Sequence, residues 1–117
     1  MNWKKGLTLF MAVGLAAGVL AGCGSDTASD KKVITFGAET TYPPFEFAED
    51  NTYKGFDVDL SNALAKEMGY ESKFVSLPFD GLIPALQSKQ IDAIASGLVV
   101  TKEREAKVNF TAPYYHV

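Results

Sequence analysis

The chain has 117 residues, 47% of them hydrophobic, and a formal net charge of −3 at pH 7. This mild acidity argues against nucleic acid as a partner, because a nucleic-acid-binding surface calls for a basic patch or stripe. The only histidine, His116, has no second histidine and no cysteine beside it with which to form a metal site. We therefore expect no metal and no cofactor.

The first 22 residues have the features of a secretory signal peptide. Met1 to Lys5 carries two lysines and no acid, and Gly6 to Ala21 is uncharged and mainly apolar. A basic start, a short apolar run and small residues before a cleavage site are typical of such signals. The apolar run is shorter than the roughly 20 residues that a transmembrane helix needs. The sequence thus predicts that residues 1–22 are a leader that is removed.

The tetrapeptide Leu20-Ala21-Gly22-Cys23 resembles a bacterial lipobox, in which cleavage leaves a lipidated cysteine at the new N-terminus. The resemblance implies diacylglyceryl attachment to Cys23 and an extracytoplasmic protein anchored to the cell membrane. Acyl chains hold a protein at a bilayer by burying CH₂ groups, at about 0.8 kcal/mol each. The alternative is an uncleaved membrane anchor with an incidental cysteine. Residues 23–31 are mostly small and polar, which predicts a flexible tether.

The domain that follows is expected to begin with one strand and one hairpin. Residues 32–36 are apolar and β-branched, which is typical of a strand. A loop is predicted over residues 40–45, because Pro43 and Pro44 lack backbone donors and favour an extended chain. A polar hairpin or turn is predicted over residues 46–53.

A helix is predicted from a cap at Asp57 to Met68, with a glycine placed to end it. Within it Leu60, Leu64 and Met68 recur every four residues, which predicts one buried stripe. Asp57 and Asp59 resemble a catalytic carboxylate pair, but a helix N-terminus attracts acids through its dipole and its free N–H groups. We therefore expect these two aspartates to be structural.

The rest of the chain alternates between strands and helices. A second strand is expected over residues 71–77, a second helix capped by Asp80, and a short buried strand over residues 91–95. Thr101 is placed to cap a brief helix that runs through Glu105. The order strand, helix, strand, helix, strand predicts an α/β lobe with flanking helices on a mainly parallel sheet.

Three predicted loops leave the carboxyl ends of strands, which is where open α/β sheets bind ligands. The first loop contains Glu39, a carboxylate, and Tyr42, an aromatic ring beside two prolines. The second contains Phe79. The alternative for these residues is ordinary structure, with the rings in the core and the glutamate in solvent.

The third loop combines Ser96 and Gly97, which are expected to expose backbone N–H groups, with the guanidinium of Arg104. Arginine pairs with a carboxylate through two parallel hydrogen bonds, which lysine cannot do in one plane. The alternative for Arg104 is a surface salt bridge with Glu103 or Glu105.

Five blocks recur along the domain: residues 41–47 (TYPPFEF), 55–60 (GFDVDL), 79–86 (FDGLIPAL), 91–93 (IDA) and 101–104 (TKER). In order and in spacing they resemble the bacterial family 3 extracellular solute-binding proteins, which are the polar-amino-acid receptors of ABC importers. The resemblance covers essentially all of the chain after the leader.

The resemblance also implies which residues meet the ligand. Tyr42 and Phe79 match the aromatic pair that sandwiches the aliphatic stem of the ligand. Arg104 matches the arginine that holds its α-carboxylate. Ser96 and Gly97 match strand-end residues that meet its α-amino and α-carboxylate groups.

Two further positions concern specificity. Glu39 falls where the family often has an acid facing the ligand's side chain, which favours arginine, lysine, histidine or glutamine over glutamate and aspartate. Val99 departs from the family, since many members have Thr or Ser there, and only its backbone amide remains to serve the carboxylate.

The fold implied is a type II periplasmic-binding-protein-like lobe over residues 32–117, with the second lobe absent from this chain. The apolar, aromatic run over residues 113–117 predicts a truncated chain. Family members close two lobes around an amino acid, so one lobe should hold half a site and bind weakly or not at all. We expect a monomer that works with an ABC permease and ATPase complex.

Two other functions are compatible with this fold. Periplasmic dehydratases use it, and so do ligand-sensing domains of receptors. An enzyme would need a positioned proton donor, and the sequence offers no distinctive acid–base set. We therefore expect binding rather than catalysis.

Overall fold

The structure, a computed structural model, describes residues 32–117. The predictions for the leader at residues 1–22, for Cys23 and for the tether at residues 23–31 lie outside the described residues. Within residues 32–117 no helix is long and apolar enough to cross a bilayer.

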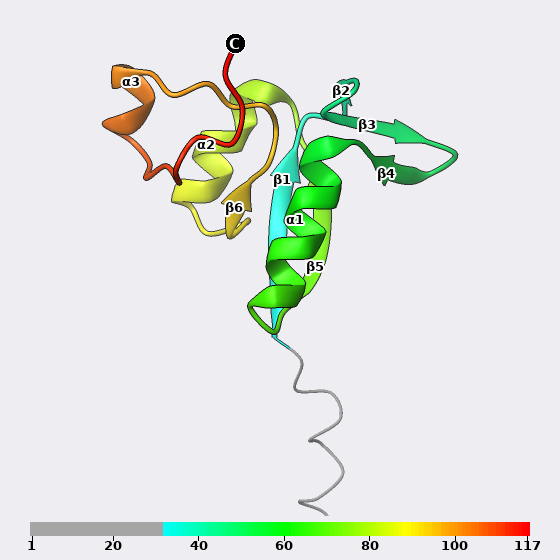
Figure 1. Cartoon of the computed structure of the whole chain (residues 1–117). Helices are drawn as coiled ribbons and strands as arrows, with labels where there is room; N and C mark the ends of the chain where they lie inside the picture. The colour runs from blue at the N-terminus through cyan, green and yellow to red at the C-terminus, as the bar shows by residue number, and fades with distance from the viewer. Residues whose placement is uncertain (1–31) are drawn as a thin grey trace, which may run out of the picture. The chain divides into compact units, whose positions relative to one another are not determined.

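The described residues form two small sheets and three helices (Figure 1). The parallel sheet has the strand order β5-β1-β6, and the antiparallel sheet has the order β2-β3-β4. The elements in chain order are β1 (Val33–Ala38), β2 (Thr41–Tyr42), β3 (Glu46–Glu49), β4 (Thr52–Lys54), α1 (Phe56–Glu67), β5 (Glu71–Ser76), α2 (Phe79–Gln87), β6 (Ala93–Ile94) and α3 (Lys102–Glu105).

Strand β1 lies in the middle of the parallel sheet, and a helix covers each of its faces. The crossover from β1 to β5 and the crossover from β5 to β6 run in opposite directions across the sheet, so right-handed connections place α1 and α2 on opposite faces. Alternate residues of β1 serve the two sides. Phe36 packs in a cluster with Ala65 of α1, whereas Gly37 lies against Leu82 and Ile91.

The predicted α/β order and the hairpin are confirmed. The hairpin turns at Asp50 and Asn51, which both adopt positive φ angles of 51° and 59°, as a two-residue turn between twisted strands favours. Two strand boundaries differ from expectation. The predicted loop over residues 40–45 contains the short strand β2, and the strand expected over residues 91–95 is reduced to β6.

The predicted buried stripe on α1 is wrong. Leu64 is 49% exposed and Met68 is 55% exposed, although both were expected in the core. The buried face instead carries Val58, Ser61 and Ala65, which follow the i, i+3, i+7 spacing of one helix face. Their side chains are small or medium-sized, so the helix lies close against the sheet and directs its leucines elsewhere.

Neither predicted aspartate cap exists. The N-cap of α1 is Gly55 and that of α2 is Pro78, so Asp57 and Asp80 lie inside the first turns. Backbone carbonyls satisfy the first donors of α1, because the Asp57 N–H donates to the Phe45 carbonyl at 2.8 Å. The third predicted cap is confirmed, since the Thr101 hydroxyl accepts from the backbone N–H at the third position of α3.

The start of α1 depends on the absence of a side chain at Gly55. This residue has a φ of +121°, and a Cβ built there would lie 2.3 Å from the Phe45 carbonyl oxygen. Gly69, just after the helix, also has a positive φ of +79°, but a Cβ there would meet nothing within 4 Å. The two glycines thus share the backbone constraint and differ in the space around them.

We expect Gly55→Ala to lower the free energy of unfolding by about 3 kcal/mol, and Gly69→Ala by about 1 kcal/mol. Both variants strain the backbone, but only the first pushes a methyl group against a fixed carbonyl. Urea unfolding followed by circular dichroism measures both values. Equal losses in the two variants would contradict the steric explanation.

Candidate functional site

Two adjoining clefts lie near the carboxyl ends of the parallel strands. The apolar cleft has a volume of about 300 Å³ and is lined by Tyr42, Phe45, residues 97–100 and residues 110–117. The charged cleft has a volume of about 540 Å³ and is lined by Phe79, Asp80, Ile83, Pro84, Gln87, Leu98, Thr101, Glu103, Arg104 and Lys107. Leu98 lines both, so the clefts share a wall.

These clefts gather five of the seven predicted ligand residues. Tyr42, Gly97 and Val99 line the apolar cleft. Phe79 and Arg104 line the charged cleft. Glu39 and Ser96 line neither of the two, although both are held next to Gly97, as described below.

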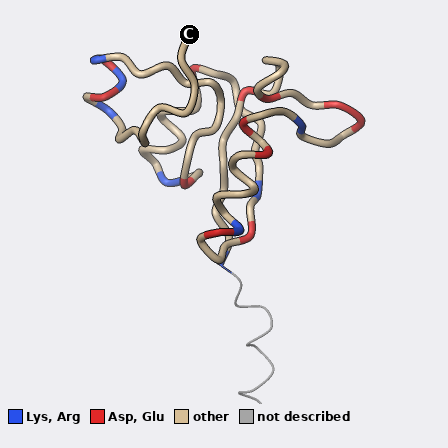
Figure 2. The backbone as a smooth tube through the Cα atoms, viewed as in Figure 1, with Lys and Arg blue, Asp and Glu red and all other residues tan. Residues whose placement is uncertain are grey.

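The apolar cleft is uncharged over its whole lining, and Figure 2 shows its C-terminal wall without blue or red segments. The ring of Tyr42 stacks on Phe45 at 5.5 Å between centroids, and Tyr115 meets the other aromatic partner edge-on at 5.0 Å from Phe45. A Cβ at Gly97 would lie 3.4 Å from the Tyr42 ring. Glycine here therefore lets the loop come close to the tyrosine.

In the charged cleft, the guanidinium of Arg104 lies over Phe79, with 5.3 Å between Cζ and the ring centroid. Its Nη1 donates to the Val99 carbonyl at 2.7 Å. Within residues 32–117 it forms no ion pair with Glu103 or Glu105, so the alternative of a surface salt bridge is wrong. The ring and the carbonyl fix the planar group at the wall between the clefts.

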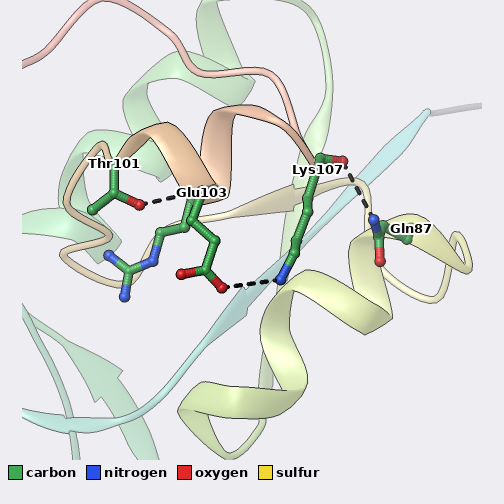
Figure 3. Close-up of polar contacts among 5 residues, drawn as sticks. Gln87, Thr101, Glu103 and Lys107 are labelled. Carbon is green, nitrogen blue, oxygen red and sulfur yellow. Dashed lines mark hydrogen bonds and ion pairs between the residues drawn. The ribbon is translucent and has the colours of Figure 1, made fainter.

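Helix α3, which carries Arg104, is held by polar contacts that Figure 3 draws. The Thr101 hydroxyl accepts from the backbone N–H of Arg104 at 3.2 Å. Lys107 pairs with Glu103 at 3.4 Å between Nζ and Oε1, and its carbonyl accepts from Gln87 Nε2 at 3.4 Å. The last contact links α3 to α2. These bonds set where Arg104 leaves the backbone, although the exposed ion pair contributes little on its own.

The residues next to Gly97 are tied to the interior. The Ser96 hydroxyl, on a residue that is 3% exposed, donates to Glu46 Oε1 at 2.9 Å and accepts from the Glu39 N–H at 2.9 Å. The Gly97 N–H donates to Asp57 Oδ2 at 2.7 Å. The expectation that Gly97 exposes a free N–H is therefore wrong, because a buried carboxylate occupies it.

Sequence reasoning missed Glu46 and assigned Asp57 only a capping role. Both side chains are buried, each 1% exposed. Burial, as the largest cause, raises the pKa of Glu46 to about 8, and the neighbouring charges of Asp57 and Glu39 raise it further, against a lowering by the Ser96 hydrogen bond. A signal was present in the sequence, since Glu46 lies between two phenylalanines within the block shared with the family.

Residues 34–117 match the family model described as bacterial extracellular solute-binding proteins, family 3. The chain belongs to this family. Its fold is accordingly that of a type II periplasmic-binding-protein lobe, as the sequence predicted. Members of the family are extracytoplasmic by description, and the relatives below are named as binding proteins.

Two curated family members are close in sequence. The chain is 42% identical over 115 residues to the arginine-binding extracellular protein ArtP of Bacillus subtilis (strain 168), covering 96% of the chain and 45% of ArtP. It is 47% identical over 89 residues to the ABC transporter arginine-binding protein 1 of Escherichia coli (strain K12), covering 75% of the chain and 37% of that protein. The chain thus spans less than half the length of these family members.

One solved structure in the family matches the lobe by itself. It is the arginine-bound form of domain 1 from TmArgBP, with a TM-score of 0.69 and 45% sequence identity, covering 71% of the chain and 67% of that structure. The similarity is high enough to compare both fold and sequence.

We expect Ser96→Ala to lower the free energy of unfolding by about 1–3 kcal/mol, because it leaves the Glu39 N–H and a Glu46 oxygen without a partner. Ser76→Ala is the control. Its hydroxyl bonds Thr40 at an exposed site, so the change should stay within about 0.5 kcal/mol. Chemical denaturation of both variants at pH 6 provides the measurement. A Ser96→Ala loss no larger than that of the control would contradict the buried link.

Proposed function

We propose that this chain belongs to the extracytoplasmic binding component of an ABC importer for a polar amino acid, with arginine as the first candidate. The observation that carries the proposal is the placement of Arg104, the only arginine in the sequence, over Phe79 at the wall between the two clefts. A guanidinium fixed in this way presents a flat pair of donors, which suits an α-carboxylate. The names of the curated relatives support arginine as the ligand.

The two clefts divide the work of recognition. We propose that Tyr42 and Phe79 flank the aliphatic stem of the ligand, since these half-exposed rings line neighbouring clefts that share Leu98. Val99 already offers its carbonyl to Arg104, so its part is to orient the guanidinium as well as to line the cleft.

Glu39, Ser96 and Gly97 complete the proposed site from behind the apolar cleft. Ser96 and Gly97 hold the loop in place through their internal hydrogen bonds. The Glu39 carboxylate accepts from the Thr41 hydroxyl and is proposed to favour a ligand with a donor-bearing or cationic side chain. Such a carboxylate disfavours glutamate, whose side chain would bring a second negative charge.

The complete receptor is proposed to be a monomer with a second lobe that closes over the ligand and then meets an ABC permease and ATPase complex. The one-domain structure with arginine bound supports a stronger role for a single lobe than the sequence analysis expected. We therefore propose that the lobe described here binds arginine by itself. Binding without chemical conversion, rather than dehydration, is supported by the names of both curated relatives.

Calorimetric titration of the purified protein tests the proposal. We expect saturable one-to-one binding of arginine, binding at least tenfold weaker for agmatine, which lacks the α-carboxylate, and none for glutamate. In Arg104→Ala the affinity for arginine should fall by about 10- to 100-fold, because the charged hydrogen bonds to the carboxylate are lost. The preference over agmatine should disappear with it.

Lys102→Ala is the matched control, since it removes a cation from the same helix without touching either cleft. Its affinity for arginine should equal that of the wild type. Absence of arginine binding in the folded wild-type protein would sink the assignment of the ligand. Equal losses in the two variants would show that Arg104 acts only through overall charge.

Anchoring by a lipid at Cys23 is a separate proposal, which the sequence of residues 20–23 supports. In cells labelled with a radioactive fatty acid, we expect the wild-type protein to carry label and to sediment with membranes. Cys23→Ser should lose the label and leave the membrane fraction, because no acyl chain remains to be buried. Labelled Cys23→Ser protein would contradict the assignment.

A further inference from the structure

Two buried carboxyl groups from different elements hold consecutive residues of one loop. Glu46 belongs to β3 and Asp57 to α1, and each is 1% exposed. Glu46 Oε1 accepts from the Ser96 hydroxyl at 2.9 Å, and Asp57 Oδ2 accepts from the Gly97 N–H at 2.7 Å. The loop that separates Glu39 from the apolar cleft is therefore fixed by these two acids.

Each acid has one oxygen left over. Glu46 Oε2 and Asp57 Oδ1 are buried and have no hydrogen-bond partner within the described part of the chain. Buried polar atoms without a partner are costly and call for an explanation. Carboxylate oxygens only accept when ionised, whereas a protonated carboxyl group also donates. One proton between the two groups would give both leftover oxygens a partner.

The surroundings favour a neutral acid at this position. The groups that act on the Glu46 pKa are burial first, then the Ser96 hydroxyl, Asp57 by its charge and by a hydrogen bond, and Glu39. No cation is among them. The Tyr114 hydroxyl faces the same pair, and burial together with the charges of Asp57 and Glu46 raises its pKa, so it stays neutral. Two close, buried carboxylates do not both ionise readily.

We propose that Glu46 and Asp57 share one proton as a carboxyl–carboxylate pair, and that this pair is the positioning device that holds Ser96 and Gly97 at the ligand site. Glu46 carries the proton and donates it to Asp57, which keeps its negative charge for the Gly97 N–H. The consequence for the ligand rests on the proposed function, but the proton itself does not. Loss of the proton would place two negative charges in one buried site and loosen the loop.

The proton is measured directly on the wild-type protein by ¹³C NMR of the glutamate and aspartate side-chain carboxyl carbons. We expect the Glu46 resonance to titrate near pH 8 and the Gly97 amide resonance to shift with the same midpoint. In Glu46→Gln the amide side chain can accept from Ser96 and donate to Asp57 at every pH, so the Gly97 shift should no longer titrate. A Glu46 midpoint in the ordinary range of glutamates would overturn the proposal.

The stability of the protein gives a second readout with a defined sign. The folded state keeps a proton on Glu46 that the unfolded state loses above the ordinary pKa of 4.5, so stability is highest below that pH and falls up to about pH 8. The unfolding equilibrium constant should rise about tenfold per pH unit within this window from this group. Glu46→Gln should remove that dependence. Glu49→Gln, an exposed change on the same strand, should retain it.

Tyr114→Phe separates the pair from its neighbour. If the carboxyl pair alone holds the proton, the Gly97 profile should keep its midpoint in this variant to within about one pH unit. A return of the Glu46 midpoint to the ordinary glutamate range in Tyr114→Phe would assign the proton's retention to the tyrosine and overturn the proposal.

Arginine titrations at pH 7 and pH 9 connect the pair to the ligand. The wild-type affinity should fall at least tenfold over this range, whereas the affinity of Glu46→Gln should not depend on pH. A wild-type protein that ignores arginine at both pH values, while Glu46 and Gly97 titrate together near pH 8, would refute the proposed function and leave the pair intact. Equal pH dependence of affinity in the two proteins would refute the positioning role.

Discussion

The central place of β1 in the parallel sheet is the constraint on which the site depends. It pairs with β5 from Val33 opposite Glu71 to Ala38 opposite Ser76, and with β6 on its other edge. Because all three strands are parallel, the loops that leave their carboxyl ends emerge at one edge. Figure 1 shows the hairpin, α3 and the C-terminal end of the chain at that end of β1. Residues far apart in sequence thus meet there without any single motif containing them.

The sequence predicted well whatever follows from local pattern. The order of strands and helices, the hairpin turn at Asp50 and the Thr101 cap were all recognisable, because a turn, a cap or an apolar run depends on a few neighbouring residues. The errors concern choices made by tertiary contacts. The buried face of α1 was set by how closely the helix approaches the sheet, which favoured Ala65 over Leu64.

The site shows the same division. Residues that lie on loops after predicted strands, such as Tyr42, Phe79 and Arg104, were found from topology and family resemblance, and the structure places each of them on a cleft. The buried pair was missed because its partners are distant. Glu46 is 50 positions from Ser96, and Asp57 is 40 positions from Gly97. In a sequence, an acid beside a helix start resembles a cap, and only the packed structure shows which N–H it accepts from.

The placement of the aromatic residues has a consequence for spectroscopy. Tyr42, Tyr114 and Tyr115, three of the five tyrosines of the chain, line the apolar cleft, and the only tryptophan is Trp3, within the predicted leader. Once the leader is removed, tyrosine is the sole source of intrinsic fluorescence, and most of the emitters surround one cleft. The emission of the processed protein is therefore an internal reporter of whatever enters that cleft, with no added dye and no tryptophan signal to mask it.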